Sequence, residues 1–113
     1  MKTAPARAIG EQTPILDLRG HRHGEQIRGA LYYNSKALLE ADPLVLPLPK
    51  ERTIALCAND DGTTDAVAHK LVASGYEDVV LIEGGIDGWK AAGRPVEGET
   101  QEQPVPTVGD AGI

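Results

Sequence analysis

The residue of this sequence best suited to covalent chemistry is its single cysteine, Cys57. It ends a short, almost continuously apolar run, Thr53–Cys57, which is typical of a strand covered on both faces. Ligands of parallel α/β folds bind beyond the carboxyl ends of the strands, so a thiol there is placed to act as a nucleophile. The alternative is a small buried hydrophobic side chain without a chemical role.

A loop rich in turn-forming and acidic residues follows Cys57 and leads into a helical segment. It consists of Ala58, Asn59, Asp60, Asp61, Gly62 and Thr63. Its backbone N–H groups and the dipole of the following helix would stabilise a thiolate. The carboxylates of Asp60, Asp61 and Asp65 act in the opposite direction, because nearby negative charge raises the pKa of a thiol and repels an anionic substrate. No Arg or Lys occurs within Thr53–His69 to offset them.

Two other short segments are expected at the same edge of the sheet. Asp17 and Arg19 come at the end of the first predicted strand, and Gly84 and Gly85 follow the last one. From the residues alone, Asp17 and Arg19 are expected to form a local ion pair at the rim. Gly84-Gly85 is interpreted as a tight turn beside the cysteine loop, since it lacks the lysine of a P-loop and the full glycine pattern of a dinucleotide site.

The histidines do not indicate a metal or base site. His21 and His23 form a His-x-His pair without an evident third ligand, so we expect them in a solvated loop. His69 lies inside the helix after Cys57 and is not assigned as a base. A single cysteine also excludes Cys-rich zinc and iron–sulfur sites and any disulfide within the chain. We therefore predict no metal and no cofactor.

Apolar periodicity predicts the elements that would position these residues. Strand-like and helix-like segments alternate along the middle of the chain, and Gly75 is suited to end the longer helix. The predicted strands are 15–18, 30–33, 53–57 and 79–82, and the predicted helices are 64–74 and 86–92. This alternation indicates an α/β fold in three layers, with a parallel sheet of four or five strands and helices on both faces.

Composition narrows the class of protein further. The chain has 113 residues, of which 41% are hydrophobic and 4% aromatic, and this suits a single domain with an aliphatic core. The net charge of −6 argues against nucleic acids and anionic membranes as partners. No apolar stretch is long enough to span a membrane, and the first residues lack a signal-peptide core, so we expect a cytoplasmic protein.

The two ends of the chain differ from its middle. Residues 1–14 are predicted to be an irregular leader, 15–97 the folded domain, and 98–113 a disordered tail that contains Pro, Gly and acidic residues. Either Arg7–Ile9 forms a remnant strand at the edge of the sheet, or that edge stays open. An open edge, or the tail, would offer a site for a protein partner.

Several segments resemble the rhodanese (sulfurtransferase) family. Ile15–Arg19 resembles the family's strand ending in Asp-x-Arg, and Leu56-Cys57 resembles the strand that ends on its active cysteine. Gln26–Ala30 resembles the family's Gly-His-Ile-Pro-Gly-Ala turn, and Gly75-Tyr76 resembles its Gly-aromatic turn. Near the end of the domain, Glu83–Trp89 resembles the family's Gly-Gly-x-x-x-Trp motif, and Ala92–Glu97 resembles its Ala-Gly-x-Pro-Val-Glu motif. Gln26 stands where the family often has His, and we assign it no catalytic part.

The resemblance implies a sulfur transfer in two half-reactions. Cys57 would take sulfane sulfur from a small donor or a protein persulfide and carry it as a persulfide. A thiol acceptor or cyanide would then remove it, and the loop 58–63 would bind the anionic sulfur. The supporting residues would be Asp17, Arg19, Gly84 and Gly85.

The loop departs from the family pattern in a way that bears on the donor. The family's best-known active loops carry Arg five residues after the cysteine, where this chain has Gly62. We therefore predict that thiosulfate is a poor donor and that a neutral or protein-borne persulfide is a better one. The main alternative is a rhodanese-like module that binds or regulates a partner without catalysis. An oxyanion phosphatase or arsenate reductase would need Cys-x5-Arg, and that position is Thr63.

Overall fold

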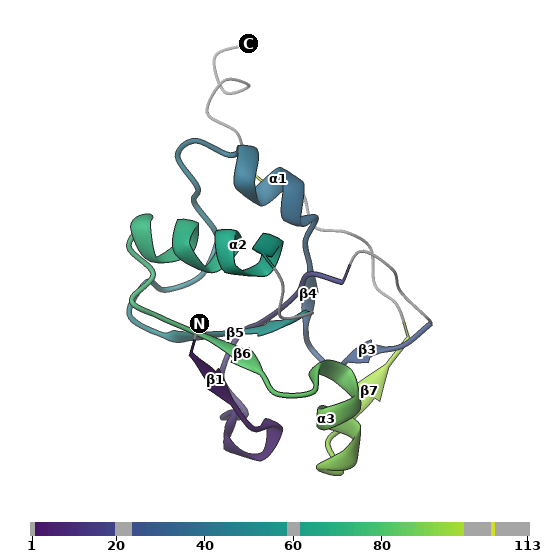
Figure 1. Cartoon of the computed structure of the whole chain (residues 1–113). Helices are drawn as coiled ribbons and strands as arrows, with labels where there is room; N and C mark the ends of the chain where they lie inside the picture. The colour runs from purple at the N-terminus through teal and green to yellow at the C-terminus, as the bar shows by residue number, and fades with distance from the viewer. Residues whose placement is uncertain (1, 20–23, 59–61, 99–104, 106–113) are drawn as a thin grey trace.

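A five-stranded sheet forms the centre of the fold in a computed structural model, which describes residues 2–19, 24–58, 62–98 and 105 (Figure 1). Its strands lie in the order β1-β6-β5-β2-β4, and every neighbouring pair is parallel. The strands are β1 (Thr3–Ala4), β2 (Ile15–Asp17), β4 (Leu31–Tyr32), β5 (Thr53–Cys57) and β6 (Asp78–Ile82). The predicted α/β fold with a parallel sheet is confirmed.

Side chains of the central strand alternate between the two faces of the sheet. On β5, Ile54 and Leu56 belong to the hydrophobic core on one face, and Ala55 and Cys57 belong to the core on the other. This is the two-residue period of an extended strand. Asp17 on β2 is the register partner of Cys57, so both side chains point to the same face.

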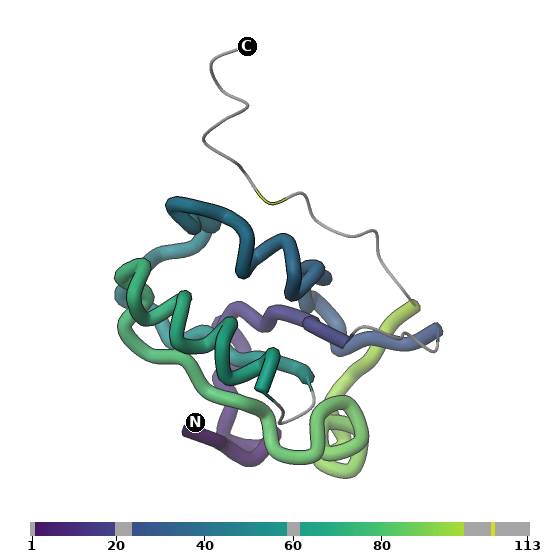
Figure 2. The backbone as a smooth tube through the Cα atoms, turned by 45° about the horizontal axis from the view of Figure 1, so that its top comes forward, coloured from purple at the N-terminus to yellow at the C-terminus, as the bar shows by residue number. Residues whose placement is uncertain are grey.

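Helices cover both faces of the sheet, as predicted. α1 (Ser35–Glu40) and α2 (Gly62–Ala73) lie together on one face, and α3 (Gly85–Ala91) lies on the other (Figures 1 and 2). Gly75 follows α2 with a φ of 101°, the left-handed conformation with which many helices end. No helix in the described part of the chain is long and apolar enough to cross a membrane.

Helix α1 was not predicted, although its start carries a recognisable signal. The side-chain oxygen of Asn34 accepts a hydrogen bond from the N–H of Ala37 at 3.1 Å, which caps the first turn. Lys36 and Glu40 form an exposed ion pair across one turn at 3.8 Å. Leu38 points into the core and is fully buried, so packing of this short helix comes mainly from one side chain.

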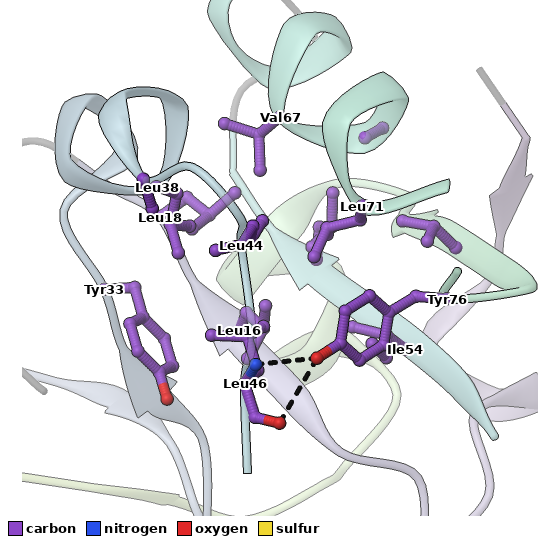
Figure 3. Close-up of a cluster of buried hydrophobic side chains, with 14 of the residues drawn as sticks. Leu16, Leu18, Tyr33, Leu38, Leu44, Leu46, Ile54, Val67, Leu71 and Tyr76 are labelled. Carbon is purple, nitrogen blue, oxygen red and sulfur yellow. Dashed lines mark hydrogen bonds between the residues drawn. The ribbon is translucent and has the colours of Figure 1, made fainter. Parts of the chain in front are cut away.

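Each face of the sheet has its own hydrophobic core. The core under α1 and α2 is built from large side chains, mainly leucines with Tyr33 and Tyr76 (Figure 3). The Tyr76 hydroxyl accepts a hydrogen bond from the N–H of Leu46 at 2.6 Å and donates one to its carbonyl at 3.2 Å. The core under α3 is smaller and consists of Ala6, Ile9, Ile15, Ile27, Ala30, Ala55, Cys57, Val80, Ile82 and Trp89.

A second, two-stranded sheet was not predicted. Its strands, β3 (Gln26–Ile27) and β7 (Val96–Glu97), are antiparallel and lie near α3 (Figure 1). The N–H of Gly29 extends the pairing, since it donates to a carboxylate oxygen of Glu97 at 3.1 Å. This small sheet fixes the chain that leaves α3 to the segment that precedes β4.

The predicted irregular leader, 1–14, contributes to the folded domain. Arg7–Ile9 does not form the remnant strand, because Ala6–Ala8 is a turn of 3-10 helix (η1). The edge strand is β1, which pairs Thr3 with Leu81 of β6. The edge of β6 is therefore covered, and β1 itself is the edge of the sheet.

Arg94 fastens this leader to the end of α3. Its Nη1 donates to the carbonyls of Ala6 at 2.7 Å and Ile9 at 2.6 Å. Its guanidinium also lies over the Trp89 ring, 3.9 Å from the centroid. At the other end of the chain, most of the predicted tail, 98–113, lies outside the described residues, so its disorder stays a prediction.

Candidate active site

The Cys57 thiol lies at the carboxyl end of the central strand, where the apolar run predicted it. Strand β5 is flanked by β6 and β2, and a strand covered on both faces needs a continuous run of apolar residues. The Cys57 side chain is 0% exposed. On β2, its register partner Asp17 is also 0% exposed, which places a carboxylate and the thiol side by side on neighbouring strands.

A cavity of about 470 Å³ opens at this end of the sheet. Its lining residues are Thr3, Arg19, Cys57, Ala58, Leu81, Ile82, Glu83, Gly84, Gly85, Ile86 and Asp87. The cavity therefore brings the cysteine together with Arg19, Ala58 and the Gly84-Gly85 turn, all of which were predicted as site residues. The thiol itself lies beneath the cavity surface, since Cys57 has no exposed area.

Asp17 and Arg19 form a two-pronged ion pair next to the thiol. Arg19 Nε donates to Asp17 Oδ1 at 2.9 Å, and Arg19 Nη2 donates to Asp17 Oδ2 at 2.7 Å. Nη2 also donates to the carbonyl of Glu25 at 2.6 Å. The pair is a local one that also ties the end of β2 to the segment before β3, and its role in holding the loops around the cysteine stays a prediction.

The thiol is held strongly in its protonated form. Burial raises the pKa of the Cys57 thiol from its ordinary value of 9.0 to about 12, because a thiolate would lose its hydration. The Asp17 carboxylate raises this pKa as well. The Arg19 guanidinium and the backbone N–H of Ile86, which is hydrogen-bonded to the sulfur, lower it. Hence the two groups that favour a thiolate are present but outweighed.

The groups that raise this pKa differ from those expected. From the sequence, Asp60, Asp61 and Asp65 are the carboxylates that would raise it, whereas the largest cause is burial and the carboxylate that acts among the described residues is Asp17. Asp60 and Asp61 lie outside the described residues. The difference arises because Asp17 is distant from Cys57 in sequence and adjacent to it only through sheet pairing.

The Gly84-Gly85 turn delivers the Ile86 amide to the sulfur. Both glycines have positive φ angles, 73° and 55°, which side chains on L-residues rarely allow. The turn is closely packed, since a Cβ on Gly88 in the next turn would lie 2.2 Å from the carbonyl oxygen of Glu83. This turn is the tight one that was predicted, and the residue that it positions, Ile86, was not predicted.

Comparison with known families decides how this arrangement is classified. The model of the rhodanese-like domain family matches residues 4–92. The chain belongs to the rhodanese-like domain family.

Solved structures of this family have the same fold. The rhodanese-like domain of the Alr3790 protein from Anabaena, solved by NMR, is 26% identical over 95% of this chain and 92% of that one, with a TM-score of 0.66. A crystal structure of the Alr3790 protein is 31% identical over 80% of this chain and 71% of that one, with a TM-score of 0.60. A thiosulfate sulfurtransferase from Pseudomonas aeruginosa is 26% identical over 75% of this chain but only 16% of its own, with a TM-score of 0.55.

The cysteine loop of this rhodanese-like domain is described only at its ends. Ala58 is partly buried and lines the cavity, while Gly62 and Thr63 are exposed at the start of α2 and are not among the lining residues. The rest of the predicted loop, Asn59–Asp61, lies outside the described residues. Within the described part, the amide on the sulfur therefore comes from Ile86 in the first turn of α3.

Among the described residues, the other polar and aromatic residues considered from the sequence are not placed in the Cys57 cavity. The Trp89 indole N–H donates to the Pro95 carbonyl at 2.8 Å, and the buried Gln26 amide donates to the Ala30 carbonyl at 2.9 Å. His69 is exposed on α2, and the His21-x-His23 pair lies outside the described residues. Across residues 2–19, 24–58, 62–98 and 105, no cluster of three His, Cys, Asp or Glu could hold a metal ion.

Sequence reasoning did not assign six of the cavity residues to the site: Thr3, Leu81, Ile82, Glu83, Ile86 and Asp87. Ile86 contributes a backbone N–H, for which its side-chain type gives no signal. Thr3 reaches the cavity only because β1 pairs with β6. Glu83 and Asp87 flank the glycine turn, so their position beside Gly84-Gly85 was the one available clue.

Proposed function

We propose that the protein is a sulfurtransferase that carries sulfane sulfur as a persulfide on Cys57. The observation that carries the proposal is the position of the sulfur, which lies at the carboxyl end of the central strand and receives the Ile86 N–H. The same amide would stabilise the negative charge of a persulfide. Membership of the rhodanese-like family supports this use of the cysteine. The reduced thiol suits a cytoplasmic location, which we propose as well.

The transfer is balanced in two displacements. In the first, the Cys57 thiolate attacks the outer sulfur of a donor persulfide, a new S–S bond forms on Cys57, and the donor leaves as a thiolate that takes up a proton. In the second, an acceptor thiolate attacks the outer sulfur of the Cys57 persulfide. The bond formed in the first step then breaks, which returns the Cys57 thiolate and leaves the acceptor as a persulfide.

The charges and the pKa of the Cys57 site support slow turnover with thiosulfate as the sulfur donor. With a pKa of about 12, only about one Cys57 thiol in 10⁵ is ionised at neutral pH. Thiosulfate brings two negative charges to a site in which the Arg19 charge is already paired with Asp17. We therefore expect low thiosulfate:cyanide turnover and faster transfer from a neutral persulfide.

The second candidate function is a rhodanese-like module that binds or regulates a protein partner without catalysis. The complete burial of the Cys57 side chain and the high pKa of its thiol favour this alternative. In that case the thiol would serve as a small buried hydrophobic group.

Mass spectrometry of the intact protein distinguishes the two functions. After incubation at pH 8 with 2-mercaptoethanol persulfide, whose organic group is uncharged, we expect a mass increase of about 32 Da, one sulfur atom. The increase should be absent in Cys57→Ser, which lacks the only cysteine. Return to the original mass after addition of a thiol acceptor would complete the cycle. A folded wild-type protein that never gains the mass would contradict the sulfurtransferase and leave the binding module.

A further inference from the structure

The charged residues around the Cys57 cavity are unevenly balanced. Three of its lining residues carry charge: Arg19, Glu83 and Asp87. Arg19 is bound through its Nε and Nη2 atoms to Asp17, which is fully buried and does not line the cavity. Seen from the cavity, the positive charge of Arg19 is therefore largely compensated from behind.

The two carboxylates are not compensated in this way. Glu83 accepts a hydrogen bond from the uncharged Thr3 hydroxyl at 3.3 Å, and both Glu83 and Asp87 are exposed. Among residues 2–19, 24–58, 62–98 and 105, no ion pair reaches either carboxylate. Lys90 of α3 forms its ion pair with Glu25 at 2.9 Å, and its ammonium also interacts electrostatically with Asp87.

Both carboxylates are tied to the residues that hold the sulfur. Glu83 directly precedes the Gly84-Gly85 turn, and Asp87 directly follows Ile86, whose N–H contacts the thiol. Glu83 and Asp87 thus form a negatively charged wall of the cavity. A donor whose outer sulfur reaches Cys57 would place its organic group beside this wall. Even for exposed carboxylates such as these, one unit charge a few ångströms away alters binding by about threefold.

We infer that the Cys57 cavity selects persulfide donors that carry a positive charge close to the sulfane sulfur, with Glu83 and Asp87 as the selecting residues. The inference rests on the proposed sulfur transfer. The shared chemistry is an ammonium group within a few bonds of the persulfide, whether on a small aminothiol or on a cysteine persulfide flanked by lysine. Anionic donors are disfavoured by the same wall.

Three small persulfides of similar size test the inference, and they differ in the charge of the organic group: cysteamine persulfide (cationic group), 2-mercaptoethanol persulfide (uncharged group) and 3-mercaptopropionate persulfide (anionic group). The initial rate of persulfide formation on Cys57 is measured by mass spectrometry at low ionic strength. The ratio of the cationic to the anionic rate is then compared between proteins, so that the intrinsic reactivity of each donor cancels. A lysine-flanked peptide persulfide, run beside cysteamine persulfide, distinguishes a protein source from a small-molecule source.

Glu83→Gln and Asp87→Asn should each lower this ratio about threefold, and the double variant about tenfold, relative to the wild type. Glu77→Gln, which removes an exposed acid that does not line the cavity, should leave it unchanged. The effect should shrink in about 1 M salt, where screening acts over roughly 3 Å. Gln and Asn keep the size of the side chains, and circular dichroism checks that each variant is folded.

Two results would overturn the inference and are distinguishable from each other. If the wild type forms the persulfide but the double variant keeps the same ratio, the carboxylates do not select the donor, while the sulfurtransferase stands. If no donor of any charge yields a persulfide, the proposed function fails and the selectivity fails with it.

Discussion

The two faces of the sheet differ in the size of the side chains that cover them. Under α1 and α2 the core is filled by leucines and two tyrosines, whereas under α3 it is built largely from alanine, isoleucine and cysteine around Trp89. Cavities of about 380, 470 and 630 Å³ lie along α3 and the segments beside it. We call the side under α1 and α2 the filled face, and the side under α3, where these cavities among the described residues leave room for a ligand, the open face.

Strand alternation produces this division from a single stretch of sequence. Ile54 and Leu56 go to the filled face, while Ala55 and Cys57 go to the open one. A shift of one residue in register would place the thiol under α2, among the leucines. The chemistry of Cys57 therefore depends on packing that lies on the opposite side of its own strand.

The largest expected effect belongs to the ion pair at the open face. Asp17→Asn should lower the free energy of unfolding by about 4 kcal/mol, because Arg19 would lose its partner in a site where little of either side chain is exposed. It should also lower the pKa of Cys57, since the Asp17 carboxylate raises it. Urea unfolding measures the first effect, and the pH dependence of iodoacetamide alkylation measures the second.

Glu40→Gln is the matched control, because it removes the exposed ion pair with Lys36. We expect it to cost no more than about 0.5 kcal/mol and to leave alkylation of Cys57 unchanged. Equal losses of stability in Asp17→Asn and Glu40→Gln would show that the buried pair is not a structural centre of the open face.

The next effect tests the filled face. Leu71 is fully buried on α2, so Leu71→Ala should lower the free energy of unfolding by about 3 kcal/mol, through lost burial and the cavity left behind. Its neighbour Val72 is 54% exposed, and Val72→Ala should change stability by less than about 0.5 kcal/mol. Denaturant titration gives both values. A clear change in Cys57 alkylation under native conditions in Leu71→Ala would show that packing on the filled face affects the thiol on the open face.

The smallest expected effect is the change in the free energy of unfolding, per pH unit, that ionisation of the Cys57 thiol causes. The folded protein keeps the Cys57 proton up to a pKa of about 12, whereas the unfolded chain loses it near 9.0. The unfolded state therefore binds fewer protons between these values, and the contribution of the thiol to stability falls as pH rises, by about 1.4 kcal/mol per unit. Below pH 9 this contribution is fully present.

Cys57→Ala removes this dependence and serves as the reference for all other groups that titrate at high pH. Urea unfolding of both proteins at pH 8, 9, 10 and 10.5 should give a difference in stability that is constant up to about pH 9 and then declines. Parallel curves for the two proteins would show that the folded thiol ionises as easily as the unfolded one, and hence that its environment is not apolar.

The sequence predicted those parts of the fold whose signals are local. The apolar run of β5 gave the bounds Thr53–Cys57, which the structure shares, and Gly75 ended α2 as expected. Two-residue strands such as β1 and β3 have no periodicity to detect, because they are defined by partners about 70 to 80 residues away in the chain. The capping residue Asn34 was the available signal for α1.

The candidate site divides in the same way. Cys57, Arg19 and the glycine turn could be placed from strand ends, because the carboxyl ends of parallel strands share one edge. The environment of the thiol could not, since burial, Asp17 and the Ile86 amide act on it through sheet pairing and a backbone hydrogen bond. Residue type alone carries no information about either contact.

The pairing of β1 with β6 has a consequence for the order in which the domain assembles. The amides of Leu81 and Glu83 donate to the carbonyls of Lys2 and Ala4, each at 2.9 Å, so β1 finds its partner only after β6 has been synthesised. Contacts between such distant segments form late, because a long loop must close first. The part of the Cys57 cavity that Thr3 supplies therefore cannot form until the chain has been synthesised beyond Cys57 to β6.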